Sequence, residues 1–480
     1  MSIPELYDQS DAVGLAEALA RGEVSASELL DEALARTEAL NPKLNAVTMM
    51  REDVARRLIA EGLPEGPLKG VPFLLKDLGG EAVDFPSNYG SKLFADTSFG
   101  QDSAIYERLK ASGLVTFART TVPEFAVGPV TEAAIYGGPT RNPWALDRTP
   151  GGSSGGAAAA VAAGIVPAAH GSDGGGSIRI PASSCGLFGF KATRARLPDG
   201  PYAGEGWAGM AIDGFLTRSV RDTAVLLDAT QGADLGAPYW APPLEASFTA
   251  ALGRGDKGLR IAFAATNLSG EAIDPDCSAA VEEAARLLES MGHHVERALP
   301  QADTQGMMAA WTKIVACGTA LSVDSAVKKR GVPLRDGEIE GIARGAIAYA
   351  RQLSGADYLE AVGKVHAYGR EMAAFFERYD ILLTATLAEP PAKVGRFDHR
   401  PEDYVDYRMG PGRVFSYSPF TAAFNASGQP AASVPFHWTR AGLPVGIHLA
   451  AGFGRDELLM GLCARIEEAK PWFDRRPPLA

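Results

Sequence analysis

Residues 150–180 read PGGSSGGAAAAVAAGIVPAAHGSDGGGSIRI and lie in the most glycine-rich part of the chain. The first glycine turn, 151–156, precedes an alanine-rich segment, which predicts a helix that reaches Ala163. The apolar residues 165–170 then predict a strand, and 171–176 form a second glycine-rich turn. A helix followed by a strand can carry the chain out and back. We therefore expect both turns at one edge of a sheet, where ligands bind in open α/β folds.

Helix and strand patterns alternate along the rest of the chain. Helices are expected from Ser10 to Arg21, from a Ser25–Glu28 capping box to Asn41-Pro42, and over 52–60, 102–112, 220–229, 276–290 and 457–468; strands are expected over 70–78, 114–118, 259–264, 381–385 and 443–450. This alternation predicts an α/β fold with a large central mixed, twisted β-sheet covered by helices on both faces. No linker-like segment or repeat interrupts it, so we expect one domain.

Composition excludes several functional classes. The 480 residues hold 46 Lys and Arg against 58 Asp and Glu, a net charge of −12, and contain no basic run, so we expect no nucleic-acid partner. The longest apolar run, 157–163, is too short to span a bilayer, and the N-terminus lacks the pattern of a signal peptide. We therefore expect a cytoplasmic protein with no membrane contact. The four cysteines lie at least 40 residues apart, which fits no zinc spacing.

Lys76 is the first candidate for chemistry, because it lies among Leu74, Leu75 and Leu78 on a short apolar run. Burial lowers the pKa of a lysine from about 10.4 toward neutrality, which a general base requires. The alternative is that Lys76 ends a strand with its ammonium group in water.

The two glycine turns supply the other candidates. Ser153 and Ser154 are most simply N-cap residues of the alanine-rich helix. Gly174-Gly175-Gly176 offers three consecutive backbone N–H groups just before Ser177 and can form a nest for an oxyanion; the alternative is a tight turn without a role.

Three other motifs fit less well. Gly151-Gly152-Ser153-Ser154-Gly155 matches the G-x-S-x-G elbow of α/β-hydrolases, but the prolines before it are poor strand chemistry, and no downstream histidine has a telling context. A P-loop would need Gly-Lys-Ser/Thr after the glycines, where Ala157 follows. No dinucleotide-binding fingerprint is present.

The whole constellation resembles the amidase signature family. The match runs along most of the chain and is densest over 137–193, with GGPTRNPW, PGGSSGG and GSDGGGSIRIPASSCG; further matches are 70–78, 424–431 and 442–447. These motifs are long, ordered and correctly spaced. The end-to-end pattern is similar to family members that hydrolyse 6-aminohexanoate cyclic dimers or aryl acylamides.

The resemblance implies a Ser–cis-Ser–Lys triad that hydrolyses amides without a metal or cofactor. The pattern places the nucleophile at Ser177, the bridging serine after a cis peptide at Ser153, and the base at Lys76. The implied oxyanion hole is the backbone N–H groups of Gly174, Gly175, Gly176 and Ser177. Asp173, Arg179 and Ser154 are expected to support the site without reacting.

Departures from the family pattern bear on the substrate. Ile180 replaces the Gln that amidotransferase subunits carry three residues after the nucleophile, which argues against glutamine. Val127 and Gly128 lie in an apolar loop expected to border the pocket, and Cys317 is a candidate for its lining, with a small core residue as the alternative. His448 stands where relatives often have Gln.

We therefore expect a single amidase domain over 1–480, with an N-terminal helical segment 1–65, a catalytic core 66–200 and the remaining sheet in 201–480. The aperiodic, proline-rich stretch 388–419 is a candidate lid. The expected substrates are small uncharged amides with apolar or aromatic groups: anilides, cyclic or linear aminohexanoate amides, carbamates and esters. The alternatives are an amidotransferase-type subunit that needs partner chains and a Ser-His-Asp α/β-hydrolase. A homodimer is the default assembly.

Overall fold

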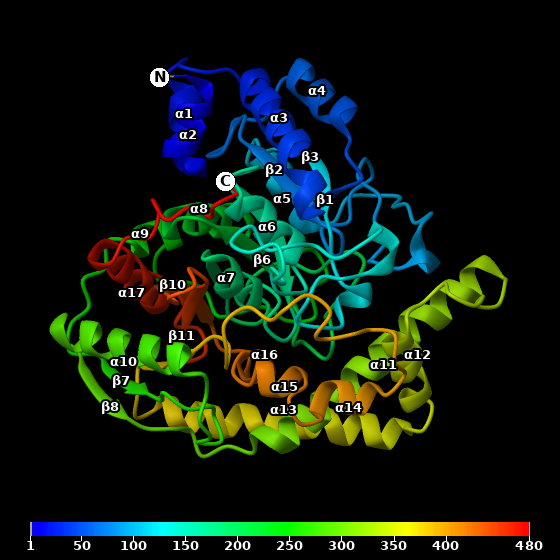
Figure 1. Ribbon diagram of the computed structural model, residues 1–480, viewed down its shortest axis with the longest axis vertical. Coiled ribbons are helices and arrows are strands. Elements are labelled where there is room, and N and C mark those ends of the chain that lie inside the picture. Colours follow the sequence, from blue (N-terminus) through cyan, green and yellow to red (C-terminus); the bar gives the residue numbers. More distant parts are fainter. Residues whose placement is uncertain (1, 480) are drawn as a thin grey trace.

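The computed structural model describes residues 2–479 and is drawn in Figure 1. Its glycine-rich stretch forms helix α6 (Gly155–Ala162), strand β4 (Ala168–Asp173) and helix α7 (Arg179–Cys185). The predicted strand over 165–170 was therefore placed three residues too early. The N–H of Ile165 still bonds the carbonyl of Ala160, at the end of α6, so the strand starts only beyond that cap.

Eleven strands form a single mixed sheet. They are β1 (Val47–Thr48), β2 (Pro72–Lys76), β3 (Val115–Thr120), β4, β5 (Phe188–Lys191), β6 (Ile212–Thr217), β7 (Arg260–Phe263), β8 (His294–Arg297), β9 (Ile381–Ala385), β10 (Ala431–Trp438) and β11 (Pro444–Ala451). Their order is β1-β3-β2-β4-β6-β5-β10-β11-β9-β7-β8. The pairs β2–β3, β2–β4, β7–β8 and β7–β9 are parallel, and the other neighbours are antiparallel.

Helices flank this sheet along its length. They are α1 (Ile3–Gln9), α2 (Ala12–Ala20), α3 (Ala26–Leu44), α4 (Glu52–Glu61), α5 (Ala104–Ala111), α6, α7, α8 (Val220–Thr230), α9 (Phe248–Ala251), α10 (Pro275–Ser290), α11 (Thr304–Arg330), α12 (Gly341–Ala350), α13 (Gly355–Phe376), α14 (Tyr404–Met409), α15 (Val414–Tyr417), α16 (Ala422–Ser427) and α17 (Asp456–Ala469). Short 3₁₀ turns lie at 92–94, 124–126 and 134–136.

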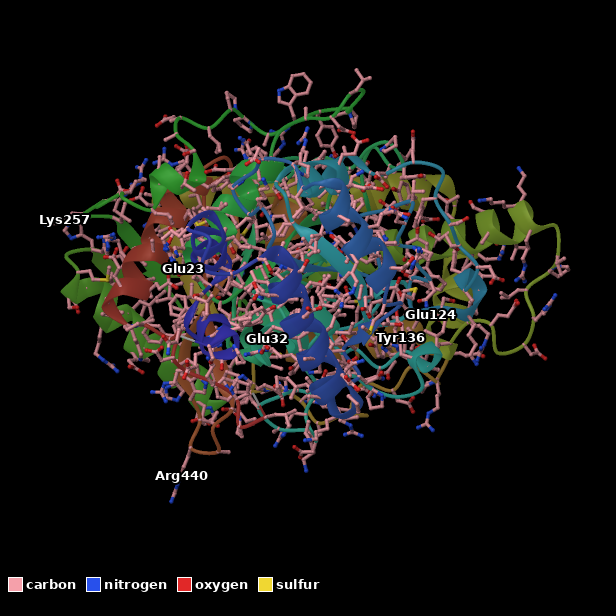
Figure 2. The ribbon with its side chains drawn as sticks, turned by 90° about the horizontal axis from the view of Figure 1, so that it is seen from above. Glu23, Glu32, Glu124, Tyr136, Lys257 and Arg440 are labelled. Carbon is pink, nitrogen blue, oxygen red and sulfur yellow. The ribbon has the colours of Figure 1, made fainter. Side chains whose placement is uncertain are left out.

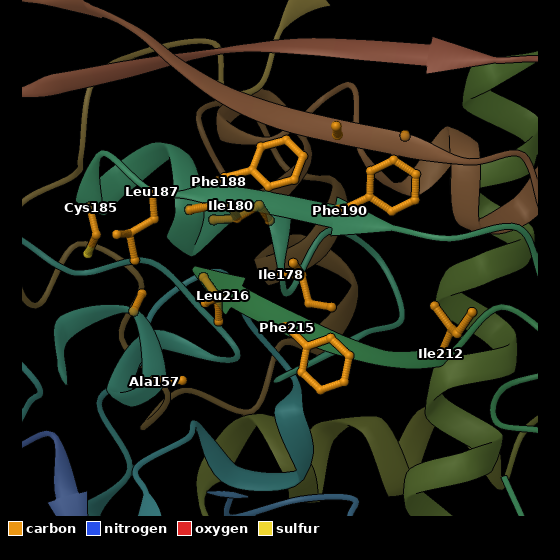
Figure 3. Packing of buried hydrophobic residues seen from close by; sticks show 14 of the residues in the cluster. Ala157, Ile178, Ile180, Cys185, Leu187, Phe188, Phe190, Ile212, Phe215 and Leu216 are labelled. Atoms are coloured by element: carbon orange, nitrogen blue, oxygen red, sulfur yellow. The ribbon is translucent and has the colours of Figure 1, made fainter. Parts of the chain in front are cut away.

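The central strands are buried on both faces, which confirms the expected α/β sheet with helical cover. Every residue of β2, β4 and β11 is buried. Helix α6 packs on β2 and β4, α8 on β6, and α10 and α17 on β10 and β11. Figure 3 shows the core beside α7, where Phe188 and Phe190 of β5 and Phe215 of β6 surround Ile178.

The N-terminal helices differ in detail from the prediction. The capping box is confirmed: the Ser25 hydroxyl accepts from the Glu28 N–H, and the Glu28 carboxylate accepts from the Ser25 N–H. Asp11, rather than Ser10, caps α2. The prediction that Asn41-Pro42 ends the next helix was wrong, because α3 runs on to Leu44.

The C-terminal half places two long helices, α11 and α13, side by side on the far side of the molecule from α1 and α2 (Figure 1). Helix α11 is long and apolar enough to cross a membrane by length and composition, but 61% of its most apolar window is buried within the fold. The stretch 388–419 is not structureless, since it contains α14 and α15. The turn between β10 and β11 carries Arg440 out from the body of the protein (Figure 2).

Candidate active site

Lys76 ends β2 and is fully buried. Its Nζ donates to Ser153 Oγ at 2.7 Å, to Ser172 Oγ at 2.9 Å and to the Ser172 carbonyl at 3.2 Å. Burial lowers the pKa of this amine to about 7, although Asp213 and Asp173 act in the opposite direction. The alternative of a strand-end ammonium in water is therefore wrong. The amine can be neutral near neutral pH and accept a proton from a hydroxyl.

Ser153 is fully buried and follows a cis peptide bond, Gly152–Ser153, as the family resemblance implies. The N-cap alternative is confirmed in position for Ser154 alone. Ser154 holds the N-cap position of α6 but makes no capping bond with its side chain. Its hydroxyl instead donates to the Ser172 carbonyl at 3.2 Å and accepts from the Ser172 N–H at 3.3 Å.

The two glycine turns meet, as the sequence predicts. The N–H of Ser154 donates to the carbonyl of Ser177 at 3.2 Å. Isolated bridges, but no named strand, lie between Asn142 and Ser154, so the local fold lacks the strand that a nucleophile elbow requires. The basic side chain bonded to Ser153 is Lys76, not a histidine.

The second glycine turn is tightly enclosed. A Cβ atom on Gly174 would lie 2.6 Å from the Trp207 ring, and one on Gly175 would lie 2.3 Å from the Trp311 ring. Gly176 has φ +130°, a conformation that side chains rarely adopt. The three consecutive glycines are thus required by space and by backbone conformation.

A buried ion pair between Asp173 and Arg179 stabilises this turn. Both Asp173 and Arg179 are fully buried, and Arg179 donates to the two Asp173 carboxylate oxygens at 2.9 and 3.0 Å. Asp173 also accepts from the Gly176 N–H at 2.6 Å. Burial alone would raise the pKa of Asp173, but Arg179 outweighs it and holds that pKa far below its usual value. His448 Nε2 lies 3.0 Å from Arg179, where it accepts from the guanidinium.

These bonds divide the N–H groups of the turn. The Gly176 N–H is occupied by Asp173, so its predicted place in an oxyanion hole is not supported. Within the described residues, no hydrogen bond engages the N–H groups of Gly174, Gly175 or Ser177. They remain available to an acceptor in the adjoining cavity.

Two cavities meet at Ser177, whose exposed fraction is 9%. The larger has a volume of about 430 Å³, within the range of small-molecule sites. Its lining residues include Ser153, Ser172, Gly174, the aromatic residues Tyr89, Phe94, Phe125, Tyr202 and Trp207, and the carboxylates Glu81, Asp199 and Asp213. The smaller has about 30 Å³ and is lined by residues that include Gly175, Ile180, Trp311 and Arg408.

The predicted pocket residues fall differently around these cavities. Gly128 lines the smaller cavity, but Val127 is buried and lines neither. Cys317 also lines neither, although the next two residues, Gly318 and Thr319, line the larger one. Burial raises the pKa of the Cys317 thiol.

Several functional candidates carried no sequence signal. Burial and neighbouring carboxylates raise the pKa of Asp199 to about 8, and burial also raises that of Glu81. Asp213 lies 3.2 Å from Nε2 of His170. These residues come from separate loops and strands, and only the sheet order brings them together. Ser172, which bonds Lys76, could have been found from the sequence, because it lies in the glycine-rich stretch 171–176.

Comparison with known proteins identifies the family of the whole chain. The Amidase family model matches residues 28–460. A 6-aminohexanoate-cyclic-dimer hydrolase from Paenarthrobacter ureafaciens is 34% identical over 478 residues, covering 98% of this chain and 96% of the relative. An acylamidase from Rhodococcus erythropolis is 33% identical over 479 residues, covering 97% and 96%. A solved structure of 6-aminohexanoate cyclic dimer hydrolase has a TM-score of 0.92 at 33% identity and covers 99% of both chains.

The chain therefore belongs to the amidase signature family, and the expected fold and family are confirmed. It is an amide-hydrolysing enzyme. Among the described residues no group of three His, Cys, Asp or Glu side chains is placed to hold a metal ion.

Proposed function

We propose that this amidase cleaves the C–N bond of small amides with apolar or aromatic groups, through an acyl-enzyme on Ser177. The observation that carries the proposal is the 2.7 Å hydrogen bond between the buried Lys76 amine and Ser153, which lines the same cavity as Ser177. A nucleophile needs a positioned base, and a lysine whose pKa lies near 7 fits that role.

The reaction proceeds by a proton relay. Neutral Lys76 takes the proton of Ser153, which takes that of Ser177 as its oxygen attacks the carbonyl carbon. The returning proton reaches the nitrogen of the leaving amine, and the C–N bond breaks. Water then attacks the ester on Ser177, using the same relay, and releases the acid.

The oxyanion of the tetrahedral intermediate is stabilised by the N–H groups of Gly174, Gly175 and Ser177. Asp173 and Arg179 maintain the shape of this turn, and Ser154 joins it to the first glycine turn. None of these three side chains takes part in the proton relay.

The substrate class follows from the walls of the larger cavity. Five aromatic rings line it, which suits anilides and other amides with apolar groups. The names of the relatives, a cyclic-dimer hydrolase and an acylamidase, support amides of this size. Cyclic or linear aminohexanoate amides, carbamates and esters are further candidates, because the same acyl transfer applies to each.

The test is hydrolysis of p-nitroacetanilide by the purified chain alone, followed by release of p-nitroaniline. We expect turnover by the natural chain and by Ser290→Ala, an exposed serine that lines neither cavity, and none by Ser177→Ala. Activity that appears only with a second chain would favour the amidotransferase-type alternative. Full activity of Ser177→Ala would contradict the proposal.

A further inference from the structure

The smaller cavity beside Ser177 is walled by hydrogen-bond donors that lack acceptors. Arg408, on α14, is 2% exposed, and its Nε and Nη2 atoms are buried without a hydrogen-bond partner. The indole N–H of Trp311, on α11, is also buried without a partner. Among residues 2–479 no ion pair engages the Arg408 guanidinium. A buried charge without a counter-ion is costly, so this arrangement calls for an anion.

Contacts with aromatic rings account for only part of the interactions that the buried Arg408 guanidinium requires. Its guanidinium lies 4.0 Å from the Trp311 ring centre, 5.2 Å from that of Phe415 and 5.7 Å from that of Tyr404. These cation–π contacts leave the Nε and Nη2 donors of Arg408 without a hydrogen-bond acceptor. The N–H donors lie in its plane and remain unused, and the acceptor that fits such a planar fork is a carboxylate.

The size of the cavity fits that group. Its volume is about 30 Å³, while a single water needs about 10–15 Å³ by this measure, so it holds about two oxygen-sized atoms. We propose that this cavity binds a carboxylate of the substrate, and that Arg408 and Trp311 determine specificity for carboxylate-bearing amides. This deepens the proposed function and rests on it for the position of the scissile bond.

The two cavities also indicate which half of the substrate carries the carboxylate. Ser153 and Ser172 line only the larger cavity, so the relay delivers its proton to a leaving amine on that side. The acyl half then points from Ser177 toward Arg408. Within the described residues the larger cavity is lined by three acidic side chains and by no Lys, Arg or His, so it offers an anion no counter-charge and favours the same orientation. The preferred substrates are thus half-amides of dicarboxylic acids, which carry a charge that the amides expected from the sequence lack.

The test uses p-nitroanilides of malonic, succinic, glutaric and adipic acid, each compared with its methyl ester. At one chain length at least, kcat/KM of the free acid should exceed that of the ester by about tenfold or more, the range of a charge-assisted hydrogen bond. Arg408→Met should remove this preference. Arg413→Met, an exposed arginine on the same stretch paired with Asp406, should keep it. An ester that equals or exceeds the acid at every length would overturn the inference.

Binding measured without turnover separates this inference from the proposed function. In titration calorimetry the natural chain should bind the preferred dicarboxylate and not its diamide, and Arg408→Lys should weaken that binding. Dicarboxylate binding without any anilide hydrolysis would remove the proposed function and leave the anion site standing. Hydrolysis of neutral anilides without dicarboxylate binding would overturn the anion site alone.

Discussion

At the scale of single residues, Lys76 connects burial to reactivity. The fully buried amine bonds two hydroxyls and one carbonyl but no carboxylate, so burial outweighs the charges of Asp213 and Asp173, which favour the ammonium form. Its pKa of about 7 means that the ammonium form dominates below that pH and the neutral form above it.

The pH dependence of catalysis follows from the lowered pKa of Lys76. We expect kcat/KM for a neutral anilide to rise with pH and level off above about 7, because only the neutral Lys76 amine accepts a proton. Lys191, another buried lysine whose pKa burial lowers to about 7, provides the control. The acid limb should persist in Lys191→Met. If the acid limb disappeared in Lys191→Met, the titration would belong to Lys191 and not to Lys76.

Removal of the base tests the same residue directly. Lys76→Ala should lower kcat by several orders of magnitude, as loss of a member of a catalytic triad does. Initial rates on p-nitroacetanilide, with circular dichroism to verify folding, measure the effect. Near-full activity would remove the lysine from the mechanism.

The sequence predicted the residues that lie within dense motifs and missed those that do not. Lys76 was singled out by its apolar neighbours and Ser153 and Ser177 by the two glycine turns, and the family resemblance implied their roles. Arg408 and Trp311, which we propose bind a carboxylate, carried no such pattern, because their segments are close only through the packing of α11 against α14. Cys317 was assigned to the pocket by its place on a predicted helix and by the family resemblance, but the next two residues, Gly318 and Thr319, line the larger cavity instead.

At the scale of elements, the turn from β4 to α7 has little space for added side-chain atoms. A Cβ on Gly175 would meet the Trp311 ring at 2.3 Å, so Gly175→Ala must displace the turn. We expect kcat/KM to fall about 100-fold, since a displacement of about 1 Å can cost that much. Gly138→Ala, where a Cβ meets nothing within 4 Å, is the matched control. Equal kinetics for the two variants would contradict a close-fitting turn.

The ion pair behind this turn makes a prediction about stability. Arg179→Met leaves the Asp173 carboxylate buried without its charged partner, which should lower the free energy of unfolding by about 3–5 kcal/mol. The denaturant midpoint measures the loss. Arg400→Met, which breaks the exposed pair with Asp398, should leave the midpoint unchanged. A similar midpoint for both variants would show that the buried pair does not stabilise the fold.

Element existence was easier to predict than element ends. The Ser25–Glu28 capping box and the strand over 381–385 were correct, because each depends on local chemistry. The end of α3 was misplaced at Asn41-Pro42. The Asn41 side chain accepts from the N–H groups of Ala46 and Val47, beyond the end of the helix, so it stabilises the following turn rather than stopping the helix.

At the scale of the whole molecule, the sheet order assembles the site. Strands β2 and β4 are parallel neighbours, so Lys76 and Asp173 both lie at the carboxyl edge of adjacent strands. The chain passes from β2 through α5 and β3, and α6 then leads into β4. The alternation of helices and strands predicted such a sheet. It could not predict the strand order, because that order depends on contacts between distant segments.

One continuous sheet should unfold as one unit. We expect a single cooperative thermal transition for the full chain, followed both by far-ultraviolet circular dichroism and by tryptophan fluorescence, and this tests the expectation of one domain over 1–480. Separate transitions for the two probes would instead divide the chain into independently folding parts.

The central claim is that Ser177 is the activated nucleophile. The most direct measurement is intact-mass analysis and peptide mapping after treatment with a fluorophosphonate probe. We expect one adduct, on Ser177, and none in Ser177→Ala or Lys76→Ala. An adduct on Ser153, or no adduct on folded protein that still hydrolyses amides, would contradict the claim.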